Sequence, residues 1–252
     1  MANTRFLITN YLKTAILKNG TGGAPARDEV SPYVIEQAVN SDRFSVWRAS
    51  SAGCRVDFDL TGAASNVSTQ VGAVLGIKGG LSSVAFSLDP TGSYPPPYTV
   101  VSTPTVNGAR NVISIAGSPI NARFASFLFA TSGSAFEVGR LVVGQIDSDI
   151  GIISSPGYDK TTQVPAQEYR TFAGVPVTNY GIGPYKTFSI PFGSITATTN
   201  AKLDALATLK QSVILIDHND VAYECRVMQY NFVQIVAAVP LFNGVLELVE
   251  LP

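Results

Sequence analysis

The sequence predicts a mainly β protein, with an N-terminal β-sandwich followed by a second β-rich domain that holds one α-helix. Two observations predict this class. Short apolar runs alternate with clusters of Gly, Pro, Ser, Thr and Asn, as in sandwiches and barrels. Hydrophobic residues make up 46% of the 252-residue chain and charged residues only 14%, so the chain can build a core. We expect a boundary near residue 145, which gives a sandwich over 31–145 and a second domain over 146–252.

The clearest strand of the first domain is residues 54–60, CRVDFDL. Apolar and polar residues alternate there with the period of two that a half-buried strand requires. The alternation predicts that Phe58 faces the core and that Asp57 and Asp59 point outward into solvent. A calcium or sugar-nucleotide site on these two acids would need further oxygen ligands, which the sequence does not supply.

Further strands are predicted between turn signals over 73–77, 84–88, 98–102, 111–115, 123–129 and 136–144. This number of short strands is enough for one sandwich. Its core is expected to contain the following large apolar residues: Trp47, Val56, Phe58, Leu75, Phe86 and Phe127.

The second domain begins with a stretch, 146–187, that is rich in Gly, Pro, Tyr and Thr and shows no periodicity. Stretches of this length without regular structure serve as arms, binding loops or connectors. The apolar spacing of 200–211 predicts a helix, with Thr199 or Asn200 as its N-cap. Strands are predicted over 212–216 and 221–236, joined by the polar loop DHND, and the chain closes with the apolar run VLELVEL.

Residues 1–30 are expected to form an extended N-terminal segment. The stretch lacks the continuous apolar core of a secretory signal, and no apolar run in the chain approaches the ~18 residues of a membrane-spanning helix. A formal net charge of −1 gives no electrostatic reason to expect nucleic acid as a partner. Cys54 and Cys225 are expected in different halves without a disulfide, as in a protein that folds in a reducing cytoplasm.

Residues that carry chemistry are few. The single histidine, His218, excludes sites that need two imidazoles, and its loop position favours an exposed turn residue. Asp147 and Asp149 could serve glycoside hydrolysis, which uses paired carboxylates, but the sequence does not place them opposite each other. We therefore expect no catalytic residues, no metal and no cofactor.

Aromatic residues provide the candidate binding segments. In SYPPPY, three prolines hold an extended loop that includes Tyr94, Pro96 and Tyr98. This loop could stack on a sugar, dock into a partner or simply connect two strands. In the irregular stretch, four tyrosines that would favour an interface mark a candidate assembly arm: Tyr158, Tyr169, Tyr180 and Tyr185.

Residues 30 to 145 resemble the discoidin-like jelly-roll domain of minor tail and tail-tip proteins of long-tailed bacteriophages. The resemblance rests on three segments: FSVWRASSAGCRVDFDL, VGAVLGIKGGLSS and ARFASFLFATSGSAFEVGRLVVG. Trp47, Arg48 and Leu60 match its first element, Leu75 and Gly76 its second, and Ala122 to Phe124 with Glu137 to Arg140 its third.

The resemblance implies a structural component of a phage tail tip, such as a distal tail, baseplate or minor tail protein. Such a protein is assembled in the host cytoplasm into the virion, with copies of itself and other tail proteins as partners. Discoidin-like folds also bind glycans, so the alternative is a receptor-binding adhesin or carbohydrate-binding module that recognises a host surface glycan. A glycan-active enzyme is the third and least favoured interpretation.

Overall fold

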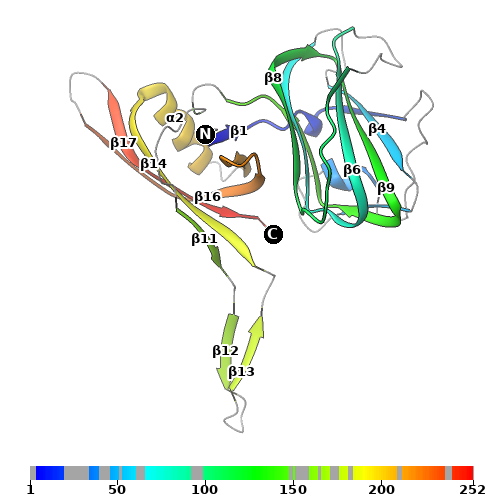
Figure 1. Cartoon of the computed structure of the whole chain (residues 1–252). Helices are drawn as coiled ribbons and strands as arrows, with labels where there is room; N and C mark the ends of the chain where they lie inside the picture. Colours follow the sequence, from blue (N-terminus) through cyan, green and yellow to red (C-terminus); the bar gives the residue numbers. More distant parts are fainter. Residues whose placement is uncertain are drawn as a thin grey trace.

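The structure is a computed structural model with two β-rich units and a two-stranded ribbon that projects from the second unit (Figure 1). It describes residues 4–19, 34–39, 46–50, 53–60, 66–91, 99–147, 150, 159–163, 166–170, 176–180, 184–208, 212–235 and 240–251. The side chains of residues 19, 166–170 and 176–180 lie outside this description. The predicted fold class, a β-sandwich followed by a β-rich domain with a helix, is confirmed.

The first unit is a sandwich of two antiparallel sheets. One sheet has the strand order β2–β4–β9–β6–β7, with β3 also paired to β9, and the other has the order β10–β5–β8. The bounds are β2 Ile16–Asn19, β3 Trp47–Ala49, β4 Cys54–Asp59, β5 Val67–Leu75, β6 Lys78–Asp89, β7 Thr99–Ser102, β8 Val112–Ala122, β9 Phe124–Val138 and β10 Arg140–Gly144. Two short helical turns, η1 Tyr11–Lys13 and α1 Glu36–Val39, belong to the same unit, and each contacts β10.

The core between these sheets is aromatic. Trp47 meets the ring of Phe129 with centroids 5.0 Å apart and that of Phe136 at 5.3 Å, both edge to face. Five of the six residues predicted for this core belong to it. The sixth, Leu75, is buried elsewhere, because its position on β5 turns it toward the second unit.

The second unit is a six-stranded antiparallel sheet with the order β1–β15–β16–β17–β14–β11, which we call the C-terminal sheet. Its strands are β1 Arg5–Leu7, β11 Asp159–Gln163, β14 Tyr185–Thr196, β15 Ser212–Ile216, β16 Ala222–Gln234 and β17 Leu241–Glu250. The helix α2, Ala197–Thr208, covers one face and buries Leu203 and Leu206 against it. It begins earlier than predicted, because the hydroxyl of Thr196 accepts a hydrogen bond from the Thr199 N–H at 3.3 Å and acts as the cap.

The N-terminal segment takes part in both units. Strand β1 pairs with β15 in the C-terminal sheet, and β2 pairs with β4 in the sandwich. Along the sequence, the residues of the sandwich are therefore inserted between β1 and the other strands of the C-terminal sheet. The segment expected to be extended over 1–30 thus contributes β1 and β2 to the two units, and strands of three or four residues are too short to show a period in the sequence.

Most described residues of the stretch predicted to be irregular lie in strands. Strand β11 pairs with β14, and beyond them β12 Ala166–Arg170 pairs with β13 Pro176–Tyr180. We call β12 and β13 the ribbon; Figure 1 shows it extending away from both units. Sequence periodicity missed β11 because all five residues of DKTTQ are exposed, so the strand has no buried face to mark its period.

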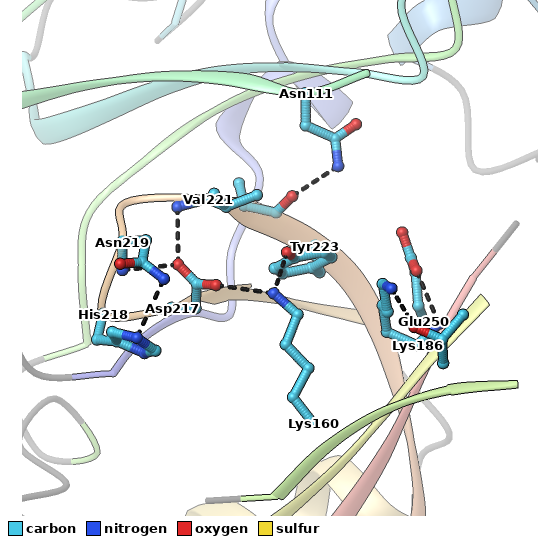
Figure 2. A network of polar contacts seen from close by, with 11 residues as sticks. Asn111, Lys160, Lys186, Asp217, His218, Asn219, Val221, Tyr223 and Glu250 are labelled. Carbon is cyan, nitrogen blue, oxygen red and sulfur yellow. Dashed lines mark hydrogen bonds and ion pairs between the residues drawn. The ribbon is translucent and has the colours of Figure 1, made fainter. Parts of the chain in front are cut away.

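An apolar contact, the ion pair of Arg140 with Glu224, and hydrogen bonds of Asn111 join the two units. Leu7, Ile214, Ile216 and Ala222 of the C-terminal sheet pack against residues of β5 and β10, including Leu75. Beside this contact, the Asn111 side chain accepts a hydrogen bond from the Gly76 N–H at 3.0 Å. It also donates one to the Ala222 carbonyl at 2.8 Å (Figure 2). No helix in the described part of the chain is long and apolar enough to cross a membrane.

Candidate functional site

The candidate glycan loop follows β6 and precedes β7 in the chain. Tyr94, Pro96 and Tyr98 fall outside the described residues, but the base of the loop is described. There the buried Asp89 carboxylate accepts hydrogen bonds from the Thr91 N–H at 2.9 Å and the Thr91 hydroxyl at 2.8 Å. These bonds fix the point where the chain leaves β6.

Three of the four tyrosines of the candidate arm lie in strands that the structure describes. Tyr158 lies outside the described residues. Tyr169 and Tyr180 belong to the ribbon, where Tyr169 is opposite Val177 and Tyr180 is opposite Ala166 in register. Tyr185 begins β14 and is half-buried. The structure thus places three of the four on the hairpin that runs from β11 through the ribbon to β14.

A groove with a volume of about 380 Å³ lies on the face of the C-terminal sheet that is turned away from α2. It is lined by Asp159, Thr161, Tyr185, Thr187, Phe188, Ser189, Met228, Glu247, Leu248 and Val249. Asp159 on β11 is in register with Ser189 on β14, and Ser189 is in register with Glu247 on β17. This cross-strand row places two carboxylates on one exposed surface, separated by two strand spacings, or roughly 9–10 Å.

The groove combines charge, hydroxyl groups and an apolar side chain. Asp159 and Glu247 are exposed, and neither forms an ion pair with any described residue. Thr161 and Thr187 form the next cross-strand pair along the groove. Met228 is 60% exposed beside them and adds an apolar side chain to the groove. This surface is suited to binding another molecule.

The other face of the same strands carries a polar network (Figure 2). The Lys160 ammonium donates to the Asp217 carboxylate at 3.1 Å and to the Tyr223 hydroxyl at 2.5 Å. It also lies 4.6 Å from the centre of the Tyr223 ring. Asp217 is fully buried, so its charge requires this partner. The network ties the edge strand β11 to the β15–β16 hairpin.

The pKa directions in this network favour a structural role. Burial alone would lower the pKa of Lys160, but its hydrogen bonds to Tyr223 and Asp217 and their charges outweigh burial and raise it. Burial raises the pKa of Tyr223, and the Lys160 ammonium offsets this only in part. A nucleophilic or basic lysine needs a lowered pKa. Lys160 therefore stays charged and Tyr223 neutral, as an ion pair that fixes a strand requires.

The hairpin loop DHND is organised by its first residue. The second carboxylate oxygen of Asp217 accepts hydrogen bonds from the Asn219 N–H at 2.9 Å and the Val221 N–H at 3.0 Å. His218 is exposed in this turn, and its ring Nε2 lies 3.0 Å from the Asn219 amide nitrogen (Figure 2). This is the exposed turn position that the sequence predicts for the histidine.

Only one member of the second acid pair, Asp147, is among the described residues. Asp149 is outside the described residues, and Asp147 pairs with Lys202 of α2 at 3.2 Å. In the part of the chain that is described, no group of three or more His, Cys, Asp or Glu side chains could hold a metal ion. Cys54 and Cys225 are buried free thiols, one in each unit.

The prediction that Asp57 and Asp59 point into solvent is wrong. The alternation itself is correct, since Val56 and Phe58 belong to the sandwich core. The two carboxylates are nevertheless 0% and 2% exposed. Strand β4 lies inside its sheet between β2 and β9, and the guanidinium of Arg123 covers Asp59 as an ion pair at 3.1 Å. Burial of a polar outer face cannot be read from period two alone.

No protein-family model and no curated protein matches the chain. Solved structures similar to it include a carbohydrate-binding module, CBM32-1, of a family 31 glycoside hydrolase from Clostridium perfringens. That match has 12% identity and a TM-score of 0.39 over 51% of this chain and 94% of the module. An F5/8 type C domain from Bacteroides fragilis matches with 13% identity and a TM-score of 0.37 over 46% of this chain and 83% of the domain.

A family 32 carbohydrate-binding module of C. perfringens NanJ, in complex with galactose, also matches. It has 14% identity and a TM-score of 0.39, over 56% of this chain and 99% of the module. All three are bacterial modules, and none is a phage tail protein.

Proposed function

We propose that this chain is a non-catalytic assembly protein that associates with copies of itself through the hairpin from β11 to β14. The observation that carries this proposal is the ribbon, which continues the paired strands β11 and β14 beyond the C-terminal sheet and away from both units (Figure 1). An isolated two-stranded hairpin is marginally stable in water, so a projecting ribbon gains stability from a partner surface.

The edge of the C-terminal sheet supports the same proposal. Strand β11 is the last strand of this sheet, so its outer backbone groups have no neighbouring strand in the described part of the chain. Edge strands of this kind pair readily with another chain. The ribbon that follows carries Tyr169 and Tyr180, and tyrosine is enriched at interfaces.

The sequence resemblance described above favours a phage tail tip as the setting. There the protein would belong to the virion, after assembly in the host cytoplasm, with other tail proteins as further partners. Tails have rotational symmetry, which requires copies to meet head to tail through two different surfaces on each chain. A ribbon on one side of the molecule and a receiving surface elsewhere meet this requirement.

The test removes the ribbon without disturbing the sheet. Gln163 and Tyr185 are opposite each other in register, so an Asn-Gly turn in place of residues 164–184 would close the hairpin directly. The mass of the particles in solution is measured for both proteins over a range of concentrations. We expect a closed oligomer for the full chain and a monomer for the shortened one. The shortened monomer should melt at the same temperature as the full chain in monomeric form, because the C-terminal sheet is intact in both. A full chain that stays monomeric, or a shortened chain that assembles equally well, would overturn the proposal.

Glycan binding by the sandwich is the second candidate function. The hydrogen bonds between Asp89 and Thr91 fix the end of β6, from which the chain continues to Tyr94 and Tyr98, and aromatic side chains are suited to stacking on a sugar ring. The similar modules named above, one of them solved with galactose, make galactose the first ligand to try. Titration calorimetry with galactose and with bacterial surface polysaccharides compares the full chain with Tyr94→Ala and Tyr98→Ala. Saturable binding that either change abolishes would support this function, release of reducing sugar would support a glycan-active enzyme, and no heat would exclude these ligands.

A further inference from the structure

We propose that the groove between Asp159 and Glu247 receives the sandwich of a second copy of this chain, through the end of the sandwich where Lys78 begins β6 and Arg110 precedes β8. This inference rests on the proposed self-association and adds a second surface to it. The ribbon would be one half of the assembly, and the groove with its basic counterpart would be the other.

The first step in the argument is that the face carrying the groove already binds a sandwich. At the β1–β15 end of this face, Ile214, Ile216 and Ala222 pack against the sandwich of the same chain. Farther along β16, Met228 is 60% exposed, and the groove begins beside it. The groove therefore continues an established packing surface that the chain's own sandwich does not cover.

The second step is that the chain's own sandwich is held at the first position. Arg140 and Glu224 form a bidentate ion pair there, and the Asn111 side chain donates a hydrogen bond to the Ala222 carbonyl. Moving this sandwich onto the groove would break a buried ion pair, which is costly. A second copy is the partner that can fill the groove without that cost.

The third step is charge complementarity. The groove presents Asp159 and Glu247, which have no ion-pair partner among the described residues. The sandwich presents Lys78 and Arg110, which are both exposed. Neither forms an ion pair with a described residue. A hydrogen bond of 2.7 Å from the Ile77 N–H to the Arg110 carbonyl holds these two cations at one end of the sandwich. Opposite charges on two separate surfaces of one chain favour head-to-tail association.

Charge reversal tests this pairing. Glu247→Lys is expected to weaken assembly of the full chain at least about tenfold, because it places like charges together. Asp204→Lys, an exposed acid on α2 that is away from the groove, is the matched control and should have no effect. Lys78→Glu should weaken assembly as Glu247→Lys does. The chain with both Glu247→Lys and Lys78→Glu should recover, since the charges are then exchanged.

The outcomes separate this inference from the proposed function. A wild-type chain that stays monomeric would overturn both. A wild-type oligomer that is unaffected by Glu247→Lys, or weakened equally by Asp204→Lys, would overturn only the groove pairing. So would a double variant that stays as weak as the single ones. If Glu247→Lys left assembly intact and abolished binding of a glycan, the groove would be a saccharide site, and the inference would be wrong.

Discussion

Arg140 of β10 and Glu224 of β16 form a two-bonded ion pair between the two units of this protein. The guanidinium donates to the two carboxylate oxygens at 3.1 and 2.5 Å, and the side chains are only 7% and 12% exposed. Two parallel hydrogen bonds fix the geometry as well as the distance. Together with the apolar contact and the hydrogen bonds of Asn111, this pair holds the sandwich against the C-terminal sheet.

Arg140→Ala is expected to lower the free energy of unfolding by about 3–5 kcal/mol, because it leaves the Glu224 carboxylate buried without its partner. Urea denaturation measures the loss. The matched double variant, Arg140→Met with Glu224→Leu, should lose much less, since it removes both charges at once. Equal losses in the two variants would show that the ion pair does not hold the units together.

Asp59→Asn is expected to lower the free energy of unfolding by roughly 1–3 kcal/mol, because the buried carboxylate loses its charge-assisted bond to Arg123. Chemical denaturation measures the loss. Arg123→Ala should have a similar effect, and the double variant should lose little more than either single one. If Asp59→Asn left the free energy of unfolding unchanged, the ion pair with Arg123 would not contribute to stability.

Lys160→Met is expected to destabilise the protein at pH 8, because Asp217 would be left buried without its ammonium partner. The folded pKa of Lys160 is raised above its usual 10.5 by the contacts with Tyr223 and Asp217, which outweigh burial. A raised folded pKa gives stability that is present below the unfolded pKa and is lost as pH rises through the folded one. The difference between wild type and variant should therefore shrink between pH 8 and pH 11 in denaturation curves. Lys186→Met, on the same face, is the control, and a difference that grows with pH would contradict the assignment.

Cys225 is expected to resist thiol reagents in the folded protein. Burial raises the pKa of its thiol well above the usual value, and the nearby Glu250 and Glu224 raise it further, so the reactive thiolate is scarce. A colorimetric thiol titration should detect neither cysteine under native conditions and both in denaturant. Rapid native labelling of Cys225 would mean that the β16–β17 core opens easily.

The sequence predicts those parts of the fold in which apolar residues line a single side. The strand over 54–60 and the helix α2 were found from this periodicity, but the burial of the opposite side of β4 was not. Strand β11 was missed because it is exposed on every residue, and the groove was missed with it. Glu247 lies in VLELVEL between Leu246 and Leu248, which are both buried, so the local alternation is consistent with its exposure. Its register with Ser189 and Asp159 depends on the pairing of strands that are far apart in the sequence. A local sequence pattern does not predict such pairing.

Amide hydrogen exchange of the full chain, measured above and below the concentration at which it assembles, tests the central claim most directly. The claim is that β11 and the ribbon are the surfaces on which copies meet. We predict that exchange slows on assembly in 159–163, 166–170 and 176–180, because these backbone groups become hydrogen-bonded or covered in the oligomer. The sandwich strands β4 and β9, which are already paired within the chain, should exchange at the same rate in both states. Equal exchange of β11 and the ribbon in monomer and oligomer would contradict the account.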